Sequence, residues 1–162
     1  YSKPARSAGS TMEDAFEPPA GFRRVKIPGN FITLNGPMYA RLEEGKFISG
    51  FHVEPRHDNA TGVCQGGMLM TLVDMQLWLA AFAQEGIEAF LPTVNLNCDF
   101  VAPAKVGAWI EGRTSFLKTT RNYVFADCVL TADGEPVLRG NGMLKILHTT
   151  EVPYELPDLL ED

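Results

Sequence analysis

The stretch HDNATGVCQGGMLMTLVDMQLWLAA, residues 57–81, contains the clearest secondary-structure signal in this chain. From Gly67 to Gln84 the sequence is rich in Met, Leu and Ala without Pro or a further Gly, and Gly86 is a typical C-terminal stop. The spacing predicts a helix over 67–84. Because this helix would itself carry apolar residues on nearly all of its faces, we expect other elements of the fold to enclose it.

Short strands are predicted on both sides of the helix. Between residues 21 and 54, apolar segments alternate with turn residues, and Glu44 and Gly45 form a candidate hairpin turn. After residue 91, apolar and polar residues alternate in four further segments, with Asp133 and Gly134 as a turn. Strands joined by such short connections pair antiparallel. The sequence therefore predicts an α+β fold, with two or so strands, the helix, and then a four-stranded meander in a curved antiparallel sheet wrapped round it.

The length of the chain, 162 residues, suits one well-filled core. Residues 1–20 are rich in Ser, Pro, Ala and charge and have no sustained apolar period. We expect a flexible or docked arm over 1–20, a single domain over 21–150, and a tail over 151–162.

Composition limits the partners of this protein. The formal net charge is -6 and no basic tract is present, which argues against binding to nucleic acid or to an anionic membrane surface. A membrane-spanning role for the helix is disfavoured by Asp74 at mid-depth. The three cysteines are widely spaced and no N-terminal signal pattern is present, so we expect a cytoplasmic protein.

Asp74 is an unusual residue for the middle of an apolar helix. An ionised carboxylate among Met, Leu and Trp is costly unless it is paired or hydrated. Asp74 therefore either has a structural partner or lines a cavity, and the helix itself supplies no cation. Functional carboxylates and buried structural ion pairs both fit this pattern.

Gly66 and Gly67 lie where a loop becomes the helix. Backbone N–H groups at a helix N-terminus lack intrahelical acceptors and can hold a carbonyl oxygen that gains negative charge, although a lone glycine pair more often serves only a tight turn and close packing. Gly66 and Asp74 are separated by roughly 12 Å along one helix. Both cannot act on one reacting centre within one chain, so joint catalysis requires a dimer with two equivalent sites.

The histidines and cysteines predict no metal site. His52, His57 and His148 have no metal-ligand spacing, and no Cys-x-x-Cys pair is present. Cys64 near the helix start is a conceivable nucleophile, but no base is paired with it and a buried thiol is the commoner outcome. We expect neither a metal nor another cofactor.

Two motifs resemble those of a known family. The first consists of His57, Asn59, Gly62, Gly66, Gly67, Leu72 and Asp74. The second is the segment LPTVNLNCDFVAPA at 91–104, together with the turn Thr120–Asn122. The pattern H-x-N-x-x-G-x-x-x-G-G with L-x-D resembles the hotdog-fold acyl-CoA thioesterases of the PaaI type. It covers roughly residues 35–148. The resemblance implies a hotdog fold, an acyl-CoA substrate, and a homodimer or homotetramer with sites across the subunit interface.

The resemblance also implies roles for individual residues. Asp74 is the expected general base or nucleophile, and Gly66 N–H is expected to polarise the thioester carbonyl. Asn59 would position the water or the carbonyl, and Thr93 would hold the water. Gly67, Arg121 and Asn122 are expected to contact the substrate, the last two at the nucleotide end of CoA.

Gln65 departs from the family pattern, which usually has His directly before the glycine pair. Gln can donate a hydrogen bond but cannot exchange a proton near neutral pH. This departure keeps open a second hypothesis, a hotdog protein that binds acyl-CoA without hydrolysing it, as a sensor or regulator. A hotdog dehydratase or hydratase ranks last, because the expected His is missing beside the helix.

Overall fold

A computed structural model describes residues 16–27, 29–148 and 160 of the chain. The predicted helix is α2, Gly66–Glu85, and it ends at Gly86 in the left-handed conformation (φ 62°). Its bounds agree with the prediction to within one residue at each end. Of the predicted arm, residues 1–15 lie outside the described residues, and so does the predicted tail except for residue 160.

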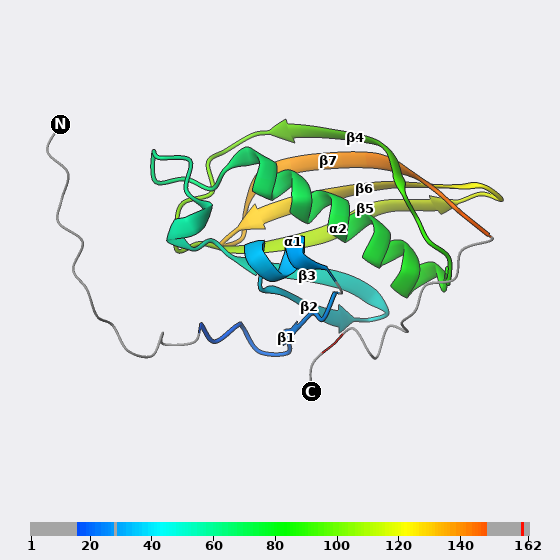
Figure 1. Cartoon of the computed structure of the whole chain (residues 1–162), viewed down its shortest axis with the longest axis horizontal. Coiled ribbons are helices and arrows are strands. Elements are labelled where there is room, and N and C mark those ends of the chain that lie inside the picture. Colours follow the sequence, from blue (N-terminus) through cyan, green and yellow to red (C-terminus); the bar gives the residue numbers. More distant parts are fainter. Residues whose placement is uncertain (1–15, 28, 149–159, 161–162) are drawn as a thin grey trace, which may run out of the picture.

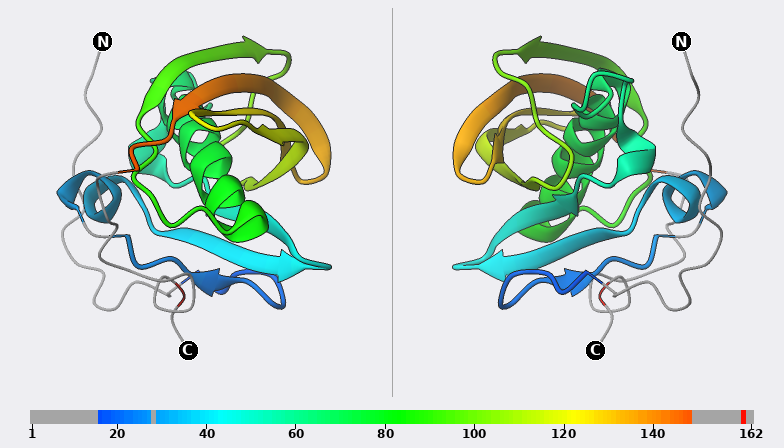
Figure 2. Two further views of the ribbon diagram at one scale, coloured as in Figure 1. Left: turned by 90° about the vertical axis from the view of Figure 1, so that its right-hand side faces the viewer. Right: turned by 90° about the vertical axis from the view of Figure 1, so that its left-hand side faces the viewer.

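One seven-stranded sheet curls round α2, which lies on its concave side (Figures 1 and 2). Its order is β1-β2-β3-β5-β6-β7-β4, and each neighbouring pair is antiparallel. The strands are β1 (Arg23–Arg24), β2 (Met38–Glu43), β3 (Lys46–His52), β4 (Thr93–Phe100), β5 (Trp109–Thr119), β6 (Tyr123–Ala132) and β7 (Glu135–Lys145). This α+β arrangement of a curved antiparallel sheet round one long helix is the predicted hotdog fold.

The two predicted hairpin turns are confirmed. Glu44 and Gly45 have φ values of 51° and 76°, and Asp133 and Gly134 have φ values of 49° and 92°. Positive φ at both central residues matches the right-handed twist of the strands that such a turn joins. The turns close the β2–β3 and β6–β7 hairpins.

The position of β4 differs from the predicted four-stranded meander. Strands β5, β6 and β7 do form a meander, but β4 pairs with β7 at the edge of the sheet and β5 pairs with β3. Residues 101–108 carry the chain across the N-terminal end of α2. Backbone bonds hold this crossing, from Cys64 N–H to Ala104 O (2.7 Å) and from Gly107 N–H to Val53 O (2.7 Å). Local alternation predicts a strand but not its neighbour, which is why the order differs.

Two short helices were not predicted. Helix α1 spans Asn30–Asn35, and a single 3-10 turn, η1, spans Pro55–His57. Helix α1 has six residues and buries none of them, so it leaves no apolar period in the sequence.

The core lies between α2 and the sheet. Leu72, Val73, Leu77 and Leu79 of the helix are each at most 1% exposed. Among the described residues, α2 is the one helix long and apolar enough to cross a membrane by length and composition, and most of it is buried against the sheet. Such a helix meets the same criteria when it forms the centre of a globular core.

Candidate active site

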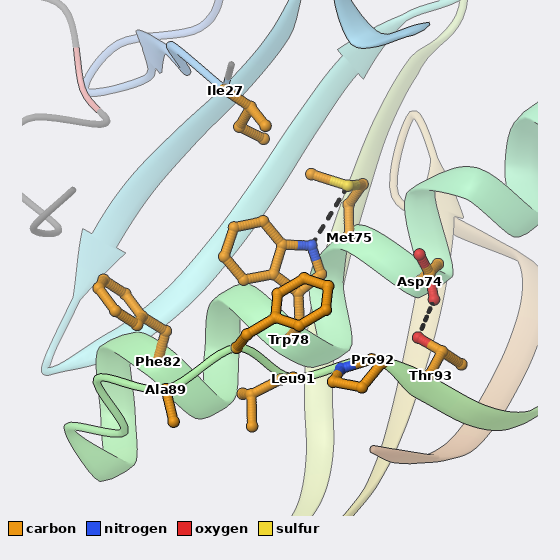
Figure 3. A pocket seen from close by; sticks show the side chains of 10 residues that line it. Ile27, Asp74, Met75, Trp78, Phe82, Ala89, Leu91, Pro92 and Thr93 are labelled. Atoms are coloured by element: carbon orange, nitrogen blue, oxygen red, sulfur yellow. Dashed lines mark hydrogen bonds between the residues drawn. The ribbon is translucent and has the colours of Figure 1, made fainter. Parts of the chain in front are cut away.

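Asp74 lines a cavity of about 390 Å³ between α2 and the segment that leads into β4. Figure 3 shows Asp74 and Thr93 together at one end of it. Its lining residues are Ile27, Asp74, Met75, Trp78, Phe82, Ala89, Phe90, Leu91, Pro92 and Thr93. A carboxylate at the end of an apolar cavity is accessible to a small ligand or to water while most of its surroundings are dry.

Thr93 holds the carboxylate of Asp74. Its hydroxyl donates to Asp74 Oδ1 at 2.5 Å, and this bond joins the middle of α2 to the first residue of β4. Among the described residues Asp74 forms no ion pair, so of the two alternatives left by the sequence the structure favours a cavity-lining carboxylate. The second oxygen, Oδ2, remains available to accept a hydrogen bond from a bound water.

Gly66 and Asn59 line a second cavity, of about 430 Å³, at the N-terminal end of α2. Gly66 is the first residue of the helix, so its N–H has no intrahelical acceptor. This free N–H is suited to hold a carbonyl oxygen. Close packing is a second reason for glycine here, because a Cβ on Gly66 would lie 3.2 Å from the Phe100 ring. A Cβ on Gly67 would meet no atom within 4 Å, so close packing does not account for the second glycine.

The loop that carries Asn59 fixes which end of its amide is free. Asn59 Oδ1 accepts bonds from Thr61 N–H (3.1 Å) and from the Thr61 hydroxyl (2.6 Å). The backbone of Asn59 is held as well, by its N–H bond to Val63 O (3.0 Å). Its Nδ2 has no partner among the described residues, so Asn59 is prepared to donate to a carbonyl oxygen or to water.

His57 is a site-supporting residue that the sequence reasoning did not identify, although it belongs to the motif. It is 5% exposed, and its Nδ1 accepts from Glu54 N–H (2.9 Å) while its Nε2 donates to Asn35 O (3.0 Å). Burial lowers the pKa of His57, and the neighbouring Arg56 charge lowers it further. A neutral His57 therefore ties α1 to the loop that carries Asn59.

The remaining predicted residues lie in two places. Gln65 directly precedes α2, is exposed, and makes no side-chain capping bond to the helix. Arg121 and Asn122 are exposed in the turn between β5 and β6 and line neither cavity. Their backbone carbonyls accept bonds, from His148 Nε2 to Arg121 O (2.8 Å) and from Ile146 N–H to Asn122 O (2.8 Å). Within one chain, the predicted residues thus form separate groups.

The two cavities lie at opposite ends of β4. Thr93 begins this strand beside Asp74, and Phe100 ends it beside Gly66. Strand β4 forms one edge of the sheet, and Val94 and Phe100 on it are 53% and 52% exposed. An unpaired edge strand with exposed apolar side chains is a ready surface for another strand.

Cys64 is unsuited to nucleophilic catalysis. It is buried at the edge of the second cavity, and burial raises the pKa of its thiol to about 11. The thiol therefore stays protonated near neutral pH, whereas the thiolate is the nucleophilic form. Among the described residues, no group of three or more His, Cys, Asp or Glu side chains could hold a metal ion.

Comparison with known proteins places the chain among thioesterases. The thioesterase superfamily matches residues 61–138, which include Gly66, Asp74 and Thr93. Acyl-coenzyme A thioesterase 13 of Mus musculus is 30% identical over 106 residues, which cover 65% of this chain and 75% of that protein.

Two solved structures are also similar. Thioesterase superfamily member 2 from Mus musculus superposes with a TM-score of 0.63 at 26% identity, covering 72% of this chain and 86% of that one. The E. coli PaaI protein from the phenylacetic acid degradation operon has a TM-score of 0.64 at 17% identity, covering 75% and 87%, which is a likeness of fold. The chain belongs to the thioesterase superfamily, as a thioester hydrolase with a hotdog fold.

Proposed function

We propose that this protein hydrolyses an acyl-CoA thioester to the free acid and CoA, with Asp74 as the general base. The observation that carries the proposal is the Asp74 carboxylate at the end of an otherwise apolar cavity, held through Oδ1 by Thr93 at 2.5 Å. A fixed carboxylate with one free oxygen is suited to orient a water molecule and take its proton.

The reaction follows from the donors and acceptors in the two cavities. Asp74 accepts a proton from water, and the resulting hydroxide adds to the thioester carbonyl carbon. The carbonyl oxygen becomes an oxyanion, for which the Gly66 N–H and the Asn59 amide are suitable donors. The C–S bond then breaks, and the proton on Asp74 passes to the departing CoA sulfur. Direct attack by Asp74, through an anhydride that water hydrolyses, uses the same contacts.

The proposed site is shared between two subunits. The cavities lie at opposite ends of β4, and Asp74 is roughly 12 Å along α2 from Gly66. If β4 pairs antiparallel with β4 of a second copy, the Thr93 end of one strand meets the Phe100 end of the other. A homodimer of this kind brings Asp74 of one chain to Gly66 and Asn59 of the other, twice. A homotetramer remains a prediction from the family resemblance, as does CoA binding by Arg121 and Asn122.

Gln65 supports one alternative, an acyl-CoA-binding protein without hydrolysis. The side chain is exposed beside the second cavity and can donate a hydrogen bond, but it cannot supply a proton near neutral pH. Hydrolysis with Asp74 as the base needs only a hydrogen-bond donor at position 65, and Gln65 can be that donor. We therefore prefer hydrolysis to binding alone.

Free-thiol release from a panel of acyl-CoA compounds tests the hydrolysis. We expect Asp74→Asn to lower kcat by about 10²–10⁴-fold, because an amide cannot accept the proton of water. Undiminished turnover in this variant would remove Asp74 from the mechanism. Tight acyl-CoA binding by the wild-type protein without thiol release would favour the binding protein.

Complementation of two variants tests the shared site. Asn59→Ala is expected to lose about 10²-fold in kcat, as for one oxyanion donor. When Asp74→Asn and Asn59→Ala chains are co-expressed with different tags, about half of the dimers are mixed and each has one intact site of two. The pool should regain about a quarter of wild-type activity. If both residues act within one chain, no activity returns.

A further inference from the structure

The cavity beside Asp74 has polarity at one end only. Among the described residues that line it, Asp74 and Thr93 are the polar ones, and they form a bonded pair (Figure 3). The rest of the wall consists of aliphatic and aromatic side chains from α2, from residues 89–92 and from Ile27. Among the described side chains, a ligand that fills this cavity meets polar groups beside Asp74, and farther along only the indole N–H of Trp78.

The cavity follows the direction of α2. Asp74, Trp78 and Phe82 are spaced four residues apart, so they lie on one face of the helix on successive turns. Asp74 and Phe82 are separated by roughly 12 Å along the axis. In Figure 3 Phe82 and Ala89 lie at the end opposite to Asp74, with Trp78 between the two ends. The cavity therefore has the form of a slot parallel to the helix.

The polar atom of the largest side chain in this wall is engaged within the helix. Trp78 Nε1 donates to Met75 Sδ at 3.3 Å. The indole N–H therefore needs no hydrogen-bond acceptor from a ligand, and the ring adds apolar surface to the slot.

We propose that this slot is the acyl site, that it selects hydrocarbon acyl groups of medium length without polar substituents, and that Phe82 sets the length limit. The inference rests on the proposed hydrolysis, because it places the thioester carbonyl beside Asp74. From there the acyl chain runs past Trp78 and ends against Phe82. A hydroxyl or carboxylate on the chain would lose its hydration without gaining a partner.

The expected discrimination has two components. A hydroxyl group in an apolar pocket costs a substrate on the order of 10²-fold in kcat/KM, and a carboxylate costs more. The second component is chain length, because an acyl chain that extends past Phe82 must leave the slot or displace the ring. The kcat/KM is therefore expected to rise from butanoyl-CoA to octanoyl-CoA and to fall at hexadecanoyl-CoA.

Kinetics on two substrate series test the inference. The length series contains butanoyl-, octanoyl-, dodecanoyl- and hexadecanoyl-CoA, and the polarity series pairs hexanoyl-CoA with adipoyl-CoA and phenylacetyl-CoA with 4-hydroxyphenylacetyl-CoA. Phe82→Ala should move the optimum to a longer chain, by about 10-fold in the ratio of dodecanoyl to octanoyl kcat/KM. Phe82→Leu, a milder change for a residue that is 6% exposed, should shift the ratio in the same direction.

A matched control is Phe125→Ala on the outer face of the sheet, where the side chain is 40% exposed and lines neither cavity. Its chain-length profile should equal that of the wild-type protein. Equal kcat/KM for the polar and apolar members of each pair, or an unchanged profile in both Phe82 variants, would overturn the inference while hydrolysis stands.

Failure of hydrolysis itself has a different signature. If no compound releases thiol, calorimetric binding of the same two series to the wild-type protein tests separately whether the slot selects acyl groups by length and polarity. Preference for octanoyl-CoA over the shorter and longer chains, and for the apolar member of each polarity pair, supports the slot in a binding protein. Equal affinities throughout would overturn it.

Discussion

Asp74 and Gln76 are two residues apart on α2, yet they meet opposite environments. Asp74 is half-buried at a cavity, and among the described residues its carboxylate accepts one hydrogen bond, from Thr93. Gln76 is fully buried, and its amide accepts from Ser49 N–H (3.0 Å) and donates to Phe47 O (3.0 Å) and to the Thr114 hydroxyl (3.0 Å). Residues at i and i+2 of a helix face different directions, so one turn can serve both a site and the core.

The bonds of Gln76 lie where the β3–β5 ladder ends. Strands β3 and β5 pair only between residues 48–52 and 109–113, after which β5 has an irregularity between Thr114 and Phe116. The Gln76 amide lies at this opening, where it bonds Phe47 O, which lies beyond the β3–β5 register, and Ser49 N–H, which belongs to the Ser49–Gly112 pair of the ladder. A polar side chain in the core therefore stabilises the curl of the sheet, whereas Asp74 has hydrogen-bonding capacity left for a ligand.

Gln76→Leu is the change with the largest expected effect on stability. It removes the three hydrogen bonds of the buried Gln76 amide, to Ser49 N–H, Phe47 O and the Thr114 hydroxyl, and we expect a loss of about 2–5 kcal/mol in the free energy of unfolding. Urea unfolding at fixed protein concentration measures it.

Two matched variants sharpen this comparison. Gln84→Leu removes one bond, from Phe47 N–H at 3.2 Å, at a half-buried residue, and should cost less. Asp74→Asn should keep stability within about 1 kcal/mol, because the amide oxygen can still accept from Thr93. Equal losses for Asp74→Asn and Gln76→Leu would remove the distinction between site and core.

Thr93→Ala should have a smaller effect, confined to activity. Without the 2.5 Å bond the Asp74 carboxylate is free to rotate, and we expect kcat to fall by about 10-fold. Thr93→Ser retains the hydroxyl and should recover most of the rate. A serine variant as impaired as the alanine variant would show that the methyl group, and not the bond to Asp74, is needed.

The sequence predicts the helix, and it singles out Asp74 as a candidate, because both signals are local. An apolar run without Gly or Pro is visible in the chain, and a lone carboxylate in it is costly wherever the rest of the fold lies. Gln76 carried no such signal, since a neutral amide on a helix fits either the surface or the core. Its role depends on the opening between β3 and β5, which residues far apart in sequence create.

The same limit applies to the assembly of the site. Alternation predicted β4 but not its place at the sheet edge, which depends on the crossing of residues 101–108 over the end of α2. The helical separation of Gly66 and Asp74 predicted that one chain cannot join them, and they do line separate cavities. The roles of Arg121 and Asn122 came from resemblance, and neither residue lines either of these two cavities.

His57 gives the smallest expected effect, a pH dependence of stability. Its pKa is lowered in the folded protein, chiefly by burial and then by Arg56, while Glu54 and the Asn35 carbonyl act in the opposite direction and His52 adds to the lowering. The unfolded chain therefore binds the proton more readily. The stabilisation from neutral His57 is complete above the unfolded value of about 6.5 and is lost as the pH falls toward the folded pKa.

Replacement of His57 by Gln tests this linkage. Gln cannot titrate, so the variant should lose less stability than the wild-type protein between about pH 7.5 and pH 5, although it begins from a lower value because the bonds to Glu54 N–H and Asn35 O are disturbed. Urea unfolding at the two pH values gives both slopes. Parallel slopes would mean that His57 does not titrate in this range, and that the loop bearing Asn59 is held independently of its protonation.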